Sequence, residues 1–201
     1  MIEWNKKIIQ IDPYSKLADY SNFPKADIIL ITHDHQDHLD ESAIEKISKD
    51  VTKIIMNSLS NEKLKNKYNA VEMKNGDQKS LSGLKIEAVP AYNVINKRKD
   101  GNPFHPKGDG NGYVLTMGNK RIYIAGDTEN IPEMKDLKDI DIAFLPMNLP
   151  YTMTPEMVAD AARSFKPKVL YPYHYGETDP ARLVTLLKDN PDIEVRIRRM
   201  K

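Results

Sequence analysis

Histidine and aspartate are concentrated in one hexapeptide, His33-Asp34-His35-Gln36-Asp37-His38, which holds three of the five histidines in the chain. Imidazole nitrogen and carboxylate oxygen are ligands that zinc and similar divalent cations prefer. The hexapeptide directly follows the apolar run Ile28–Thr32. Because alternate residues that leave a buried strand point to the same side, the first two histidines can converge on one ion. Asp37 and His38 are then free to serve a second ion, so the sequence predicts a metal site here.

Helix capping is a simpler explanation for part of this motif. Asp37 and Asp40 precede Glu41–Lys49, a predicted helix, and aspartate is a good N-cap. Capping can account for one aspartate, but it cannot account for three histidines. The metal site therefore remains the better interpretation of the hexapeptide.

The composition is typical of a folded globular protein. Hydrophobic residues make up 40% and charged residues 29% of the 201 residues. This length can bury a full core, and we expect one domain over residues 1–201. The net charge of +1 provides no global field for nucleic acid or an anionic membrane. We therefore expect a small-molecule substrate rather than a nucleic-acid or membrane partner, and the sequence does not indicate an oligomeric state.

Cysteine is absent from the sequence, which excludes disulfides and thiolate-bound metal. The first residues, Met1–Lys7, lack the continuous apolar region of a signal peptide. The sequence also has no stretch near the roughly 20 apolar residues that a transmembrane helix needs. We therefore expect a soluble, cytoplasmic protein.

Short strands and helices alternate along the chain. The expected strands are rich in β-branched or aromatic residues, and they are Lys7–Ile11, Ile28–Thr32, Lys53–Asn57, Leu84–Val89, Tyr113–Met117, Arg121–Ala125, Ile142–Leu145, Val169–Tyr171 and Glu194–Ile197. Gly118-Asn119 predicts a hairpin turn. The expected helices are Glu41–Lys49, Ser58–Lys65, Pro155–Ser164 and Pro180–Lys188. Mixed strands and helices around one core indicate a layered α/β fold.

Further polar residues follow two of these strands at the point where each strand ends. Gly126-Asp127-Thr128 comes after Arg121–Ala125, and Pro172-Tyr173-His174 comes after Val169–Tyr171. Each segment alone is compatible with an ordinary turn. Together with the hexapeptide, they supply enough nitrogen and oxygen ligands for two metal ions.

The motifs resemble those of the metallo-β-lactamase-fold hydrolase superfamily, which has an H-x-H-x-D-H signature, a bridging-aspartate motif like Gly126-Asp127-Thr128, and a late histidine motif like the one at His174. Asp12-Pro13-Tyr14 and Thr152-Met153-Thr154 are most similar to the branch that contains ascorbate-6-phosphate lactonase and uncharacterised metal-dependent hydrolases. The similarity spans nearly the whole chain. It implies a four-layer αββα sandwich, with two mixed sheets face to face, helices outside and metals at one edge.

One ligand of the superfamily pattern is missing from its usual place. Many members have a third histidine after the strand equivalent to Leu84–Val89, where this chain has Pro90-Ala91-Tyr92-Asn93. The nearest candidate is His105, in a loop rich in glycine and proline, and we assign it as the replacement ligand. Asn93 or water could instead complete the first site. His105 could then be a substrate-binding residue, an acid or an exposed loop residue.

The resemblance implies a binuclear centre. Its first ion is bound by His33, His35 and His105, its second by Asp37, His38 and His174, and Asp127 bridges the two. Two such cations would lower the pKa of a shared water and polarise a carbonyl or phosphoryl oxygen.

Other acidic residues have implied roles around this centre. Asp37 and Asp127 are the expected catalytic carboxylates. Asp12 and Asp34 are the expected partners that support the ligand histidines. Zinc is the first choice of metal, with manganese or iron as alternatives.

Substrate choice is less well indicated by the sequence. Asn93, Lys107, Thr128 and Tyr151 lie beside the motif residues and could contact a polar ligand. Lys107 is a positive charge close to a proposed ligand, so a phosphate or carboxylate on the substrate is one hypothesis.

Three classes of function fit the sequence. We favour a metal-dependent hydrolase of a small polar ester, lactone or phosphodiester. The alternatives are an RNA-processing nuclease of the same fold and a metal-binding protein without hydrolytic activity. The near-zero net charge disfavours the nuclease.

Overall fold

A computed structural model describes residues 1–81 and 83–200. The backbone forms two units, Met1–Lys74 and Asn75–Lys201, which we call the N-terminal and the C-terminal unit. Each unit is built on its own mixed β-sheet, to which helices are added. The α/β class with two mixed sheets is thereby confirmed, whereas the single domain over residues 1–201 stays a prediction.

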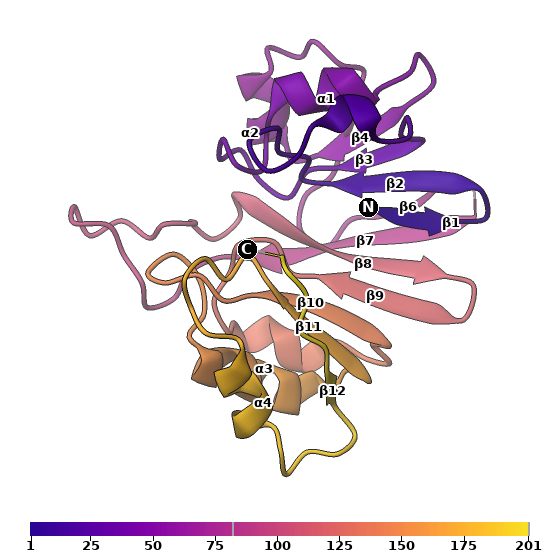
Figure 1. Cartoon of the computed structure of the whole chain (residues 1–201). Coiled ribbons are helices and arrows are strands. Elements are labelled where there is room, and N and C mark those ends of the chain that lie inside the picture. The colour runs from indigo at the N-terminus through magenta and orange to yellow at the C-terminus, as the bar shows by residue number, and fades with distance from the viewer. Residues whose placement is uncertain (82, 201) are drawn as a thin grey trace. The chain divides into compact units, whose positions relative to one another are not determined.

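The N-terminal unit contains a five-stranded sheet in the order β1-β2-β3-β4-β5 (Figure 1). β1 is antiparallel to β2, and the other neighbours are parallel. The strands are β1 (Ile2–Trp4), β2 (Lys7–Ile11), β3 (Ile28–Leu30), β4 (Lys53–Met56) and β5 (Val71–Glu72). The helices are a 3-10 turn η1 (Tyr20–Asn22), α1 (Glu41–Ile47) and α2 (Ser58–Lys63).

The core of the N-terminal unit lies between these helices and the sheet. Ile44 and Ile47 of α1 pack in one apolar cluster with Ile29 of β3 and Met56 of β4. α1 begins where predicted, because the Asp40 side chain accepts a hydrogen bond from the Ala43 backbone N–H. The apolar face and this cap together fix α1 directly after the hexapeptide.

The C-terminal unit contains a seven-stranded sheet in the order β12-β11-β10-β9-β8-β7-β6 (Figure 1). Its strands are β6 (Gln78–Leu81), β7 (Leu84–Ala91), β8 (Gly110–Met117), β9 (Lys120–Ile124), β10 (Ile142–Pro146), β11 (Val169–Tyr173) and β12 (Glu194–Val195). β6 to β9 are antiparallel neighbours, whereas β9 to β12 are parallel. The helices are η2 (Pro132–Asp136), α3 (Pro155–Phe165) and α4 (Ala181–Leu186).

The core of the C-terminal unit forms where α3 packs on the parallel strands. Val158 and Ala162 of α3 share an apolar cluster with Ala143 and Leu145 of β10. The Thr154 hydroxyl caps α3 by accepting from the Met157 backbone N–H at 3.1 Å. Among the helices of the described residues, none combines the length and apolar character needed to cross a bilayer.

Every strand and helix predicted from the sequence is present, with bounds that differ by at most three residues. The hairpin at Gly118-Asn119 is confirmed, since Met117 pairs with Lys120. β1, β5 and β6 were not predicted. They are sheet-edge strands of two to four residues, too short to carry a clear alternation of apolar and polar side chains.

Asp141 joins three parallel strands at the edge of the sheet where β9, β10 and β11 begin. Its carboxylate accepts hydrogen bonds from the Arg121 backbone N–H at 2.9 Å and from Lys168 and Lys120 at 2.8 and 3.2 Å. The hydrogen bond from Lys168 lowers the pKa of Asp141 to about 2, burial opposes this shift, and the other two bonds assist it. Asp141 therefore stabilises the fold in its ionised form.

We predict that Asp141→Asn destabilises the protein at pH 7 by about 1–2 kcal/mol, because a charged acceptor of several hydrogen bonds is lost. The folded-state pKa of about 2 lies below the ordinary value of 3.8. This stabilisation is therefore complete above pH 4 and is lost as the pH falls towards 2. Urea titrations should show a difference between variant and parent at pH 7 that shrinks between pH 4 and pH 2.

Asp189→Asn is the control, because this aspartate is exposed. It should leave stability unchanged at each pH. A difference between Asp141→Asn and the parent that stays constant down to pH 2 would contradict this role for the Asp141 charge.

Candidate metal centre

In the N-terminal unit, two parallel strands release polar residues at the same edge of the sheet. β2 and β3 pair with Ile11 opposite Leu30, so Asp12 and Thr32 leave the sheet close together. Asp12 has a positive φ of 41°, a strained conformation for a residue other than glycine. Such strain is often found at functional sites.

The Asp12 carboxylate holds His38 in a defined orientation. One oxygen accepts from the Thr32 backbone N–H at 2.8 Å, and the other accepts from the Thr32 hydroxyl at 2.7 Å and lies 2.8 Å from His38 Nδ1. Since a carboxylate can only accept, Nδ1 of His38 is the nitrogen that donates. Nε2 of His38 therefore presents its lone pair, as a metal ligand must.

The hexapeptide folds into a turn that packs its imidazoles together. The His38 backbone N–H donates to the His35 carbonyl at 3.0 Å. The ring centroid of His33 lies 4.6 Å from that of His35 and 4.1 Å from that of His38. Asp37 extends beside His38, with 3.6 Å between Oδ2 and Nε2. The turn thus gathers all four predicted ligands of this unit.

Asp34 has a different partner from the one expected. Its carboxylate lies 3.4 Å from Lys63 Nζ, and its backbone carbonyl also accepts from Lys63. These contacts join the hexapeptide to the end of α2. In the described part of the chain, the structure thus places Asp34 against a lysine rather than a ligand histidine.

In the C-terminal unit, the register of the sheet brings several loops to one edge. β9 and β11 are both parallel to β10, so Asp127 and His174 follow strands that end at this edge. β7 and β8 are antiparallel, with Ala91 opposite Gly110. The loop that connects them, which carries Asn93 and His105, therefore starts and ends at the same edge.

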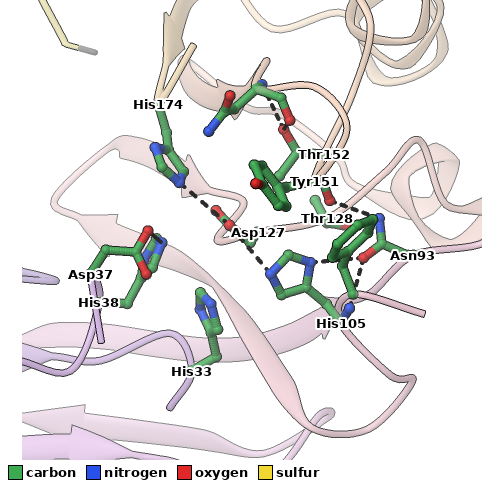
Figure 2. A network of polar contacts seen from close by, with 12 residues as sticks. His33, Asp37, His38, Asn93, His105, Asp127, Thr128, Tyr151, Thr152 and His174 are labelled. Carbon is green, nitrogen blue, oxygen red and sulfur yellow. Dashed lines mark hydrogen bonds and ion pairs between the residues drawn. The ribbon is translucent and has the colours of Figure 1, made fainter. Parts of the chain in front are cut away.

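Asp127 lies between two histidines (Figure 2). Its Oδ2 is 3.4 Å from His105 Nε2 and 3.5 Å from His174 Nε2. These distances exceed the usual N–H···O range. They are close to the separation of about 3.3 Å expected between two ligand atoms bound at about 2.0–2.1 Å to one tetrahedral zinc ion.

Asn93 orients His105 (Figure 2). The Asn93 side-chain oxygen accepts from the His105 backbone N–H at 2.8 Å and lies 2.7 Å from His105 Nδ1. The Asn93 backbone N–H also donates to the His105 carbonyl at 2.8 Å. Both residues are buried, so His105 is not an exposed loop residue.

His174 is held by its backbone. Its φ is 45°, and its N–H donates to the Met200 carbonyl at 2.7 Å. The adjacent Tyr175 hydroxyl donates to the Arg198 carbonyl at 2.9 Å. Gly176 allows this turn to approach Asn148, since a Cβ there would lie 2.7 Å from the Asn148 side-chain oxygen.

The other predicted substrate contacts differ in exposure. Thr128 is fully buried, and its hydroxyl donates to the carbonyl of Tyr92 or Glu129. Lys107 forms an ion pair with Glu133 at 2.7 Å. Tyr151 is 45% exposed. A role in substrate binding stays a prediction for all of them.

Sequence reasoning missed two residues that organise these groups. Thr32 donates to Asp12, as described above. Glu129 is fully buried, and its carboxylate accepts from Asn93 Nδ2 and from three backbone N–H groups. Glu129 could have been noticed because it lies two residues after Asp127, just beyond the end of a strand. A single glutamate in a turn, however, is part of no recognisable sequence motif.

The donor set fits divalent cations such as zinc. Each unit supplies imidazole nitrogens and a carboxylate, and at His38 and His105 an acceptor faces Nδ1, which leaves Nε2 for a ligand bond. The spacing around Asp127 is also compatible with shared coordination. The residues of each unit could therefore hold metal.

The beta-lactamase superfamily domain model matches residues 1–174. The chain belongs to this superfamily. The predicted metallo-β-lactamase-fold superfamily is thus confirmed, and the closer likeness to the ascorbate-6-phosphate lactonase branch stays a prediction.

Several known proteins are similar to this chain over most of their length. The UPF0173 metal-dependent hydrolase of Pyrococcus abyssi is 32% identical, over 96% of this chain and 90% of its own. A protein from Parabacteroides distasonis with a known crystal structure is 56% identical in sequence, and its structure matches with a TM-score of 0.92. The match covers 98% of this chain and 87% of the other. A metallo hydrolase from Ignicoccus hospitalis has a TM-score of 0.79 at 24% identity, over 98% of this chain and 89% of its own, and shows the fold alone.

We predict that Asp12→Asn weakens metal binding about 10–100-fold, as is usual when the partner of a ligand histidine is lost. An amide can donate to His38 Nδ1, which would move the imidazole proton to Nε2 and block the ligand atom. Competition with a chromophoric chelator measures the dissociation constant.

Asp34→Asn is the matched control, because Asp34 lies in the hexapeptide but contacts Lys63. It should bind metal about as tightly as the parent. Equal losses in both variants would mean that Asp12 has no specific part in orienting His38.

Proposed function

We propose that the protein is a metal-dependent hydrolase that uses two divalent cations to cleave a small polar ester, lactone or phosphodiester. Membership of the superfamily supports this, as do relatives named metal-dependent hydrolases. The sequence motifs contain six proposed metal ligands, His33, His35, Asp37, His38, Asp127 and His174. Together with His105, they are the chemical groups that such a reaction requires.

The approach of two imidazole nitrogens to one carboxylate oxygen carries this proposal. Asp127 Oδ2 lies at nearly equal distances from Nε2 of His105 and His174. A carboxylate that bridges two cations needs a ligand of each cation on either side of it. The arrangement of these residues in the C-terminal unit supports Asp127 as that bridge.

The proposed ligands come from both units. His33, His35 and His105 would hold the first ion, whereas Asp37, His38 and His174 would hold the second. The superfamily match supports a shared centre, because it extends continuously from residue 1 to residue 174 and so includes every one of these residues.

The bound cations would supply a water of lowered pKa and a Lewis acid for the substrate oxygen. The residues of the chain do the rest. Asp12 and Asn93 keep two imidazoles in the orientation and tautomer that ligation requires. The Asp37 side chain is 42% exposed, so its carboxylate is accessible for a proton exchanged with solvent or substrate.

The side chains near the proposed metal ligands of the C-terminal unit favour an uncharged substrate that carries an apolar group. Lys107 is already paired with Glu133 and lies 4.7 Å from the Tyr92 ring centroid, so its charge is not free for a phosphate. The Tyr151 ring is exposed and contacts Phe104 edge-on. We therefore rank esters and lactones above phosphodiesters.

We predict that the protein purified without chelator contains about two equivalents of metal, with zinc first, and that chelation removes hydrolysis of lactones or carboxyl esters. His38→Ala and Asp127→Ala should remain folded and lose at least about a hundredfold in kcat/KM, because each removes a ligand. Elemental analysis and a panel of lactones, carboxyl esters and bis-nitrophenyl phosphate measure both quantities.

Lys25→Ala is the control for these variants, since Lys25 is exposed, lies outside the proposed ligand set and donates a hydrogen bond to the Lys46 carbonyl. It should retain metal and activity. Metal content near zero after incubation with zinc or manganese, or parent-like turnover in His38→Ala, would contradict the proposal. Cleavage that falls steeply with salt would instead indicate a nuclease.

A further inference from the structure

We propose that Glu129 is a positioning residue that fixes the tautomer of His105 through Asn93. No motif of the superfamily resemblance includes Glu129, and its side chain is directed at Asn93 and the loop after β7 rather than at His105 or His174. Its effect on His105 follows from the directions of the hydrogen bonds that join Glu129, Asn93 and His105.

The first step is the environment of the Glu129 carboxylate. Oε2 accepts from the backbone N–H groups of Val94 and Ile95 at 2.7 and 2.6 Å. Oε1 accepts from the Asn96 backbone N–H at 2.7 Å and from Asn93 Nδ2 at 3.2 Å. Successive N–H groups of this kind form an anion-binding concavity that compensates a buried charge. These four partners are all donors, so the Glu129 side chain acts here only as an acceptor.

The second step is the orientation of the Asn93 amide. The oxygen and nitrogen of an amide are often assigned only from their neighbours. Here both neighbours on one side are obligate acceptors, because Asn93 Nδ2 faces Glu129 Oε1 and also the Tyr151 carbonyl at 2.9 Å. The NH₂ group must lie on that side, so Asn93 Oδ1 must face His105.

The third step is the imidazole of His105. Asn93 Oδ1 can only accept, so the His105 Nδ1 that lies 2.7 Å away must carry the proton. Nε2 then bears the lone pair and faces Asp127 Oδ2. Glu129 thus acts together with the Tyr151 carbonyl and the His105 backbone N–H to hold the Asn93 amide, and this amide decides which nitrogen of His105 can bind a metal ion.

Backbone hydrogen bonds also join the turn that carries Asp127 to the loop that carries Asn93. Glu129 donates its N–H to the Tyr92 carbonyl at 2.9 Å, and Thr128 joins the same two segments. One turn therefore carries both Asp127 and Glu129, the residue that holds Asn93 next to His105. This arrangement allows the carboxylate and the imidazole to keep a fixed separation.

The test uses ¹⁵N NMR of the histidine side chains in the metal-free protein, where His105 is assigned by its loss in His105→Asn. The parent should show a proton on His105 Nδ1, because this nitrogen faces an oxygen that can only accept. In Glu129→Gln, one side of the new amide must donate, so an acceptor is lost either for Asn93 Nδ2 or for the backbone N–H groups of residues 94–96. Asn93 is then held less firmly, with the Tyr151 carbonyl as its remaining acceptor. We expect a mixture of tautomers and zinc affinity lowered about tenfold or more.

Glu129→Asp shortens the reach of the carboxylate to Asn93 by one methylene, and it replaces Glu129→Gln if that variant does not fold. Asn93→Ala removes the acceptor at His105 Nδ1 itself and leaves the three backbone contacts of Glu129 intact, so it is the positive control for the tautomer shift. It should shift the tautomer in the same way. Glu133→Gln is the matched control, because Glu133 is four residues away and contacts Lys107 and Tyr92 instead. It should keep the Nδ1–H tautomer.

The zinc readout rests on the proposed function, but the tautomer readout does not. A shifted tautomer in a protein that binds no metal would support the inference and refute the proposed function. An unchanged tautomer in folded Glu129→Gln and Asn93→Ala, together with parent-like zinc affinity, would overturn the inference and leave the proposed function intact.

Discussion

The parallel register of β9, β10 and β11 is the constraint on which the C-terminal unit depends. Because these strands run in the same direction, the chain leaves β9 and β11 at the same edge, and Asp127 and His174 follow there. The N-terminal unit applies the same rule with β2 and β3, which release Asp12 and the hexapeptide. In each unit, the backbone hydrogen bonds of the sheet thus determine where the histidine and aspartate side chains lie.

Strand register alone does not orient an imidazole, and acceptors placed next to the histidines do this. Asp12 faces His38 Nδ1, and Asn93 faces His105 Nδ1. Both acceptors are themselves fixed by further hydrogen bonds, from Thr32 and to Glu129. Burying such polar groups is unfavourable unless every partner is in place. The two networks are therefore sensitive to single substitutions.

The sequence predicted the features that depend on local pattern. The hexapeptide, the cap at Asp40 and the hairpin at Gly118-Asn119 are each encoded by residues close together in the chain. The α/β class followed from the alternation of strands and helices. His105 was assigned as the replacement ligand because it is the nearest remaining histidine to the place where the superfamily pattern lacks one, and its burial beside Asp127 came from the structure.

The sequence could not predict contacts between segments that are distant along the chain. Asn93 and Glu129 are 36 residues apart, and Asp34 meets Lys63 over 29 residues. Neither pair has a spacing or composition that distinguishes it from solvent-exposed polar residues. The edge strands β1, β5 and β6 were missed for a related reason, since their pairing depends on a neighbouring strand.

The proposal that both units supply ligands to two shared cations is tested most directly by anomalous diffraction. Crystals grown with zinc would be measured on both sides of its absorption edge. We predict two peaks, each bonded to histidines of the N-terminal and of the C-terminal unit, with the Asp127 carboxylate bonded to both. A single peak, or peaks coordinated by residues of one unit only, would contradict the binuclear centre.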